Sequence, residues 1–225
     1  MALVMNKNGG GNGTRVEQKP IDPGVYPARL VQLIDLGLQA QRPYQGKDKP
    51  PAIEVMLTYE LVDEFMLDES GKPREDKPRW VSETLPLYGL FADKAKSTQR
   101  YKAFDPTEEW GGDFTKAIGL PVNVTIVNNS VGDKIYTNVA NIGAMRPKDA
   151  DKCPELKNPA KVFDVDAPDM EVFASLPEWV QTKIKGNLNF TGSALASAIA
   201  GPVAKEKKQP PKPVAKEEDD NENPY

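Results

Sequence analysis

The chain has 225 residues, a formal net charge of −4 at pH 7, one cysteine and no histidine. Without histidine it lacks the commonest general base and metal ligand, and a single cysteine excludes an intramolecular disulfide and a Cys/His zinc site. The sequence has no apolar run near the roughly 20 residues of a membrane span, and no nucleotide-binding or nucleophile-elbow motif. We therefore expect no enzyme activity, no metal, no cofactor and no membrane insertion. The lone cysteine and the absence of a secretory signal favour the cytoplasm.

Residues 16–150 are predicted to form a central domain, and its first half contains three predicted strands. Residues 25–36 are rich in β-branched and aliphatic side chains, with Pro27 near an edge or a bulge. Residues 79–87 predict another strand, which follows a hydrophilic turn. Between these two, residues 53–65 alternate between apolar and polar side chains, which places on one buried face Ile53, Val55, Leu57, Tyr59 and Leu61.

A helical segment and a hairpin follow these strands. Residues 92–104 favour a helix, and residues 113–118 favour a second short helix that ends at Gly119. Residues 121–128 and 134–145 alternate on either side of a turn and predict a hairpin. Three strands, a helix and two further strands are the order of an OB fold, a small Greek-key barrel. A generic five-stranded sandwich has the same strand count, but the helix before the last hairpin favours a mainly β, five-stranded OB-like barrel.

The two ends of the chain differ in composition from this central domain. Residues 1–15 are rich in glycine and asparagine and predict a flexible N-terminus. Residues 151–200 predict a helical extension, whose amphipathic segment Met170–Lys185 packs on the barrel; Pro177 within it allows two short helices. A partner-binding helix is the alternative for that segment. Residues 201–225 predict a disordered linker and an acidic tail.

The last nine residues, EEDDNENPY, combine five acidic side chains with a terminal aromatic residue. A block of like charges stays extended and often serves as an interaction tail. Such a tail can occupy a cationic groove at high effective concentration. Once released, it presents an aromatic ring and a carboxylate to a partner protein. A solubilising tail with an incidental tyrosine is the simpler alternative. The residues assigned to the tail are Glu217, Glu218, Asp219, Asp220, Glu222 and Tyr225.

Together these features resemble the single-stranded DNA-binding proteins of bacteriophages. The blocks YPARLVQLIDLG, EVMLTYELVDEF, DFTKAIGLPVNVTIV and LPEWVQTKIKGNLNF are similar to segments of phage proteins of this group. The acidic ending resembles the tails of phage and bacterial members, although the bacterial tails finish in Phe and this chain ends in Tyr225. The resemblance implies an OB fold that binds and protects single-stranded DNA during phage replication, recombination and repair. It also implies recruitment of phage or host replication proteins by the tail, in the cytoplasm of the infected bacterial host.

Binding of single strands without sequence preference needs cations along the backbone path and aromatic faces on which bases stack. The segments 42–49 and 100–104 interleave both kinds of residue, and the strands add further aromatic candidates. Tyr44 is the foremost candidate, because its polar neighbours give it little reason to be buried. Core packing is the alternative for Trp80, Tyr101 and Phe104. The full set of candidate DNA-binding residues is Arg42, Tyr44, Lys47, Lys49, Trp80, Arg100, Tyr101, Lys102, Phe104 and Tyr136.

Charge is the main objection to this hypothesis. Residues 1–204 contain 24 Lys and Arg against 27 Asp and Glu, so the chain is not basic even without its tail. A DNA-binding surface therefore requires the cations to gather on one side. Two alternatives stay open: a non-catalytic protein-interaction module of a phage replisome or virion, and an enzyme such as a carboxylate–metal nuclease. The sequence does not predict the oligomeric state.

Overall fold

The computed structural model describes residues 18–200. This part of the chain forms six strands, five α-helices and one 3-10 helix. The strands are β1 (Gly24–Gln39), β2 (Ala52–Leu67), β3 (Pro73–Pro86), β4 (Pro121–Val131), β5 (Lys134–Ala144) and β6 (Lys161–Phe163). The helices are α1 (Lys96–Phe104), the 3-10 helix η1 (Phe114–Ala117), α2 (Pro147–Ala150), α3 (Met170–Ser175), α4 (Glu178–Lys185) and α5 (Ala194–Ala200).

The strands form one sheet in the order β3-β2-β1-β4-β5, with antiparallel neighbours, and β6 adds to β1 in parallel. The first and last strands of this order, β3 and β5, approach each other, but no ladder joins them in the described chain. The expected mainly β fold with a helix after the third strand is confirmed. The sheet differs from the expected five-stranded barrel in having a sixth strand and in staying open. Three residues are too few for alternation to reveal β6 in the sequence.

The central strand β1 is buried on both faces because a hydrophobic core packs on each of them, and a bulge shifts its alternation. Its register with β2 is interrupted between Leu30 and Gln32. The extra residue lets Leu30 and Leu33 both face the first of two hydrophobic cores. Farther along the strand, Ile34 and Leu36 face the second core on the opposite side. This is why the sequence of β1 is an almost continuous apolar run.

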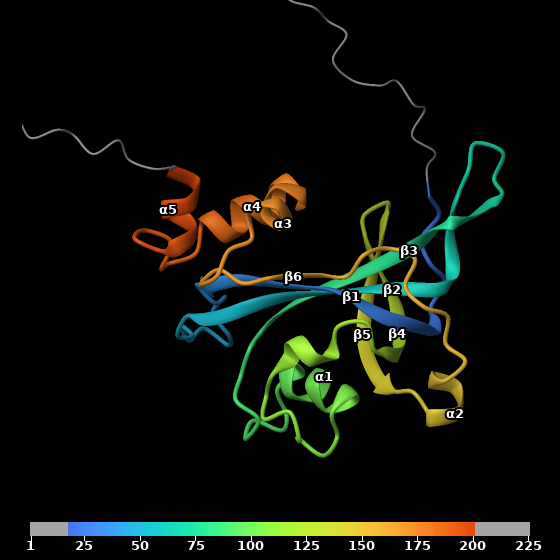
Figure 1. Cartoon of the computed structure of the whole chain (residues 1–225), viewed down its shortest axis with the longest axis horizontal. Helices are drawn as coiled ribbons and strands as arrows, with labels where there is room; N and C mark the ends of the chain where they lie inside the picture. Colours follow the sequence, from blue (N-terminus) through green and yellow to red (C-terminus); the bar gives the residue numbers. More distant parts are fainter. Residues whose placement is uncertain (1–17, 201–225) are drawn as a thin grey trace, which may run out of the picture.

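Helices cover both faces of the sheet (Figure 1). We call the face of the sheet that carries the first core the inner face and the opposite one the outer face. On the inner face, α1 and η1 contribute Tyr101 and Phe114 to the first core. On the outer face, α3, α4 and α5 pack together with β6 in the second core. The segment Met170–Lys185 forms two helices, because Pro177 stands between them. None of the described helices has both the length and the apolar character needed to span a membrane.

The segment that leads from β5 to these helices is fastened across the outer face of the sheet. We call residues 153–163 the strap. The Arg29 guanidinium, which is buried on β1, donates hydrogen bonds to the carbonyl oxygens of Pro154 (2.7 Å) and Cys153 (2.9 Å). The same guanidinium pairs with the carboxylate of Glu155 at 3.0 Å. A single cation thus holds three successive residues of the strap.

A buried carboxylate on β2 holds the next part of the strap. Glu60 accepts hydrogen bonds from the Lys157 N–H (2.7 Å) and from the Asn158 side-chain amide (2.6 Å). It also accepts one from the Trp80 indole N–H on β3 at 3.0 Å. Because Arg29 pairs with Glu60 and Glu60 pairs with Trp80 in the strand ladders, the three side chains form a row across the sheet. This row fixes the strap to the outer face.

Replacing Glu60 with glutamine should lower the free energy of unfolding by about 1–3 kcal/mol, because the glutamine amide offers one acceptor oxygen in place of two for the three donors that bond to this buried side chain. Amide hydrogen exchange at Lys157 should become faster, since its N–H loses its acceptor. Urea unfolding and exchange measured by mass spectrometry test this. Glu69→Gln, in the exposed turn between β2 and β3, is the matched control. Equal stability of the two variants would contradict a fastening role for Glu60.

Candidate nucleic-acid interface

One end of the sheet brings together two loops that are distant in the sequence. At this end, which we call the sheet end, β1 finishes and β2 begins, and residues 40–51 connect them. The third strand finishes there too, because the Leu87 N–H donates a hydrogen bond to the Ile53 carbonyl oxygen at 2.7 Å. The segment 88–95, which leads from β3 into α1, therefore starts next to the base of the 40–51 loop.

The 40–51 loop contains a tight turn that places Tyr44 opposite Lys47. These two residues exchange backbone hydrogen bonds of 2.9 and 3.1 Å. Between them, Gln45 and Gly46 have φ values of 51° and 73°, and positive values at both central positions are typical of a type I′ turn. All residues from 42 to 51 are exposed. The loop is therefore a small hydrogen-bonded hairpin with its side chains in solvent.

The Tyr44 ring is 60% exposed and belongs to neither hydrophobic core. The Lys49 ammonium lies 4.8 Å from the ring centroid, within cation–π range. Arg42 and Lys47 are exposed and make no ion pair with any residue in the described range. An exposed aromatic face beside unpaired cations is the combination with which proteins bind single strands of any sequence.

Arg100 on α1 points into the fold and is only 1% exposed. Its guanidinium binds both carboxylate oxygens of Glu83 on β3, at 2.8 and 3.1 Å. It also donates hydrogen bonds to Asn141 Oδ1 (2.7 Å) and to the Ala140 carbonyl oxygen (3.2 Å) on β5. The Tyr59 hydroxyl donates to the same carboxylate at 3.0 Å, and burial together with the Glu83 charge holds the pKa of Tyr59 well above its usual range. Arg100 thus links β3 and β5, the first and last strands in the order of the sheet.

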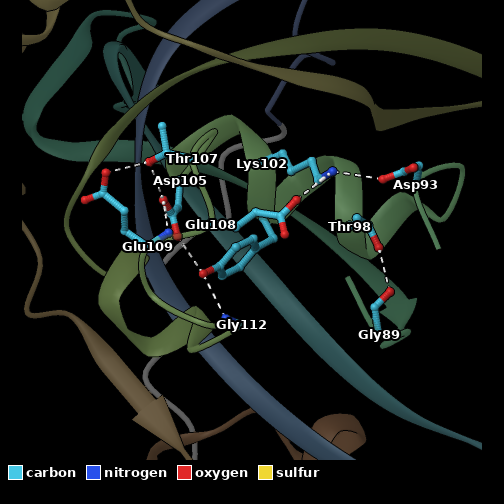
Figure 2. A network of polar contacts seen from close by, with 10 residues as sticks. Gly89, Asp93, Thr98, Lys102, Asp105, Thr107, Glu108, Glu109 and Gly112 are labelled. Carbon is cyan, nitrogen blue, oxygen red and sulfur yellow. Dashed lines mark hydrogen bonds and ion pairs between the residues drawn. The ribbon is translucent and has the colours of Figure 1, made fainter. Parts of the chain in front are cut away.

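The other candidates on α1 also have structural partners. Tyr101 is buried in the first core, and Phe104 packs partly buried against it. Lys102 lies between the carboxylates of Asp93 and Glu108, each at 2.8 Å (Figure 2). Hydrogen bonds to these two carboxylates raise the pKa of Lys102. These three candidates and Arg100 therefore serve the interior of the fold or have their charge compensated, and they are not part of the proposed interface.

The remaining aromatic candidates lie away from the sheet end. Trp80 is 40% exposed on the outer face of β3, where its indole N–H belongs to the row that fastens the strap. Tyr136 is exposed on β5, close to the turn after β4. Because β4 pairs with Gly24–Arg29 at the start of β1, that turn and the 40–51 loop lie at opposite ends of the strand. The structure thus does not bring Tyr136 next to Tyr44.

Two exposed aromatic residues near the sheet end were missed by the sequence analysis. Tyr88 and Phe91 lie between β3 and α1, and both rings are exposed. The signal was the aromatic run YGLF directly before a basic stretch. Such a run is equally typical of a chain that enters a hydrophobic core, so only the fold shows that these rings face solvent.

The assigned tail, Glu217–Tyr225, and the N-terminal residues 1–15 lie outside the described residues. Competition between the tail and a bound nucleic acid therefore stays a prediction. So do the recruitment of replication proteins and the flexibility expected of the N-terminus.

Replacing Arg100 with methionine should lower the free energy of unfolding by about 3–5 kcal/mol, because it leaves a buried carboxylate, Glu83, without its cation. Urea unfolding followed by circular dichroism measures the loss. Lys102→Met removes a more exposed cation from the same helix and should change stability far less. If the two variants were equally stable, the bridge between β3 and β5 would not matter for folding.

Comparison with known proteins leaves the family of this chain open. No protein-family model matches the sequence, and no curated protein matches it.

Proposed function

We propose that this protein binds single-stranded DNA without strong sequence preference, with Tyr44 at the sheet end as a stacking residue. The observation that best supports this is an exposed aromatic ring on an ordered hairpin, beside cations with no acidic partner among the described residues. Stacking of a base on an aromatic side chain contributes about 1–3 kcal/mol and tolerates any sequence. Arg42, Lys47 and Lys49 contact phosphates, which likewise carry no sequence information.

The distribution of charge supports the same surface. The segments 40–51 and 88–96 contain five Lys and Arg residues against two Asp, whereas the whole chain has a net charge of −4. Both segments start at the sheet end. A polyanion therefore meets a locally positive surface on an acidic protein, which is the segregation that DNA binding requires.

We also propose that the sheet is an OB-type barrel. The strand order, the helix after the third strand and the unpaired β3 and β5 agree with a partly open, five-stranded Greek-key barrel of the OB type. In OB folds the loop between the first two strands flanks the bound oligonucleotide. The corresponding loop here is 40–51. The strap covers part of the outer face, so we place the DNA at the sheet end rather than over the strap.

The biological setting follows from the resemblance to phage single-stranded DNA-binding proteins. We propose that the protein protects single strands during phage DNA replication and recombination in the cytoplasm of the infected bacterium. The acidic tail competes with DNA for the cationic surface and, once displaced, recruits phage or host replication proteins.

Tyr44→Ala should weaken binding of a labelled oligo-dT roughly tenfold, a loss of about 1.4 kcal/mol, because one stacking partner is removed. Fluorescence anisotropy at low and moderate salt, with duplex DNA as a competitor, measures this. Tyr44→Trp keeps an aromatic face and should keep the affinity. An alanine variant that bound as tightly as the unaltered chain would remove Tyr44 from the interface.

Deleting residues 217–225 should strengthen binding to oligo-dT, most clearly at low salt, because a competing polyanion is gone. Replacing the five acidic side chains of the tail with their amides is the matched control, since it removes the charge and keeps the length. Affinity unchanged at every salt concentration would show that the tail does not compete within the molecule.

A protein-interaction module is the second candidate, and one observation favours it. Near the turn between β4 and β5, large apolar side chains are exposed on both strands: Val131, Ile135 and Tyr136. Exposed apolar patches commonly mark protein contacts. If neither the intact nor the tail-deleted chain bound oligo-dT at low salt, this second function would replace the first.

A further inference from the structure

The segment between β3 and α1 exposes an aromatic pair to solvent. Phe91 is 92% exposed and Tyr88 is 47% exposed. Burying a Phe side chain is worth about 1.5–3 kcal/mol relative to leaving it exposed, so a fully exposed ring is a cost to the isolated fold. We call residues 88–96 the platform segment.

The exposure of Phe91 belongs to an ordered turn. The Ala92 N–H donates to the Gly89 carbonyl oxygen at 2.9 Å, which closes a turn around the aromatic residue. The same carbonyl accepts a hydrogen bond of 3.4 Å from the hydroxyl of Thr98, a buried residue of α1 (Figure 2). A Cβ atom at Gly89 would lie 2.4 Å from Phe91 Cε1, so glycine leaves room for the ring in this position. The turn fixes the backbone at Phe91, and the ring projects from it into solvent.

A second anchor fixes the start of the platform segment. The Tyr88 N–H donates a hydrogen bond to the Ser97 hydroxyl at 3.0 Å, and Ser97 is buried at the beginning of α1. A pocket of about 220 Å³ opens between the segment and the helix. Its lining includes Tyr88, Leu90, Thr98 and Tyr101. A flat apolar group that contacts Tyr88 therefore also finds space beside it.

Unpaired cations accompany these aromatic residues. Lys94 and Lys96 are exposed, and neither makes an ion pair with any residue that the structure describes. The only acidic residue of the segment, Asp93, has its carboxylate bonded to Lys102 at 2.8 Å. The platform segment therefore presents two free ammonium groups together with two aromatic faces.

We propose that the platform segment is a second stacking site for the same DNA strand, with bases on Phe91 and Tyr88 and phosphates against Lys94 and Lys96. This inference rests on the proposed function. The free cations favour a polyanion over an apolar protein partner, and the platform segment and the 40–51 loop both begin at the sheet end. A strand that crosses the sheet end then meets two aromatic platforms from distant parts of the sequence.

The test is the affinity of the full-length chain and its variants for labelled oligo-dT. Phe91→Ala should weaken binding roughly tenfold, while Phe91→Tyr should preserve it, because stacking needs only an aromatic face. Trp179→Ala removes an exposed aromatic residue of α4 and should leave affinity unchanged. Thermal unfolding should show the same Tm for Phe91→Ala and the unaltered chain, since the ring is exposed.

The outcomes separate this inference from the proposed function. If Phe91→Ala bound as tightly as the unaltered chain while Tyr44→Ala bound weakly, the second platform would be wrong, and the segment would instead fit a protein-docking role. If the unaltered and tail-deleted chains both failed to bind, the proposed function and this inference would fall together. Photocrosslinking with oligonucleotides that contain 5-iododeoxyuridine adds a direct readout. Adducts on the peptide that contains Phe91 support the site, and adducts confined to other segments overturn it.

Discussion

Arg100 links the first and last strands of the sheet, because its guanidinium bonds to Glu83 on β3 and to Asn141 and Ala140 on β5. No ladder joins these strands in the described chain, so one side chain from α1 provides the hydrogen bonds between them. A guanidinium suits this task, because its planar array of five donors can serve several acceptors at once. The bridge and the buried Tyr101 ring together hold α1 over the first core. The platform segment leads directly into this helix, so its place in the fold depends on the same contacts.

On the outer face, two buried charged side chains, Arg29 and Glu60, hold the strap in place. Arg29 and Glu60 are partners in the β1–β2 ladder, and most of their side-chain hydrogen bonds go to the strap. The strap ends in β6 and leads into the three C-terminal helices, and β6 and these helices pack in the second core. The result is a sheet whose inner and outer faces are both covered by the chain itself. The sheet end, where the 40–51 loop and the platform segment begin, lies outside these covered faces.

A net negative protein can bind a polyanion only if its charges are segregated. Here most carboxylates inside the fold already have partners, such as Glu83 with Arg100 and Glu60 with the strap. The cations of the two exposed loops are unpaired within the described residues, and each loop also exposes an aromatic ring. Both loops contain turns in which backbone hydrogen bonds order the main chain beside the ring, which limits the backbone entropy that binding must overcome. This arrangement supports the proposed binding of a flexible single strand.

The sequence by itself determined what depends on near neighbours in the chain. Alternation and strand-favouring composition predicted five strands, and alternation predicted the burial of Tyr59. Pro177 divided the C-terminal helical segment, and polar neighbours predicted the exposure of Tyr44. Tertiary structure decided what depends on partners far away. Arg100 and Lys94 look alike in a basic helical stretch, but only Arg100 meets a carboxylate 17 positions earlier and a strand about 40 positions later. The open sheet, the short β6 and the position of two loops at the sheet end likewise depend on contacts between residues far apart in the sequence. Local patterns report which face of an element is apolar, whereas pairing of charges and loops depends on how the elements pack.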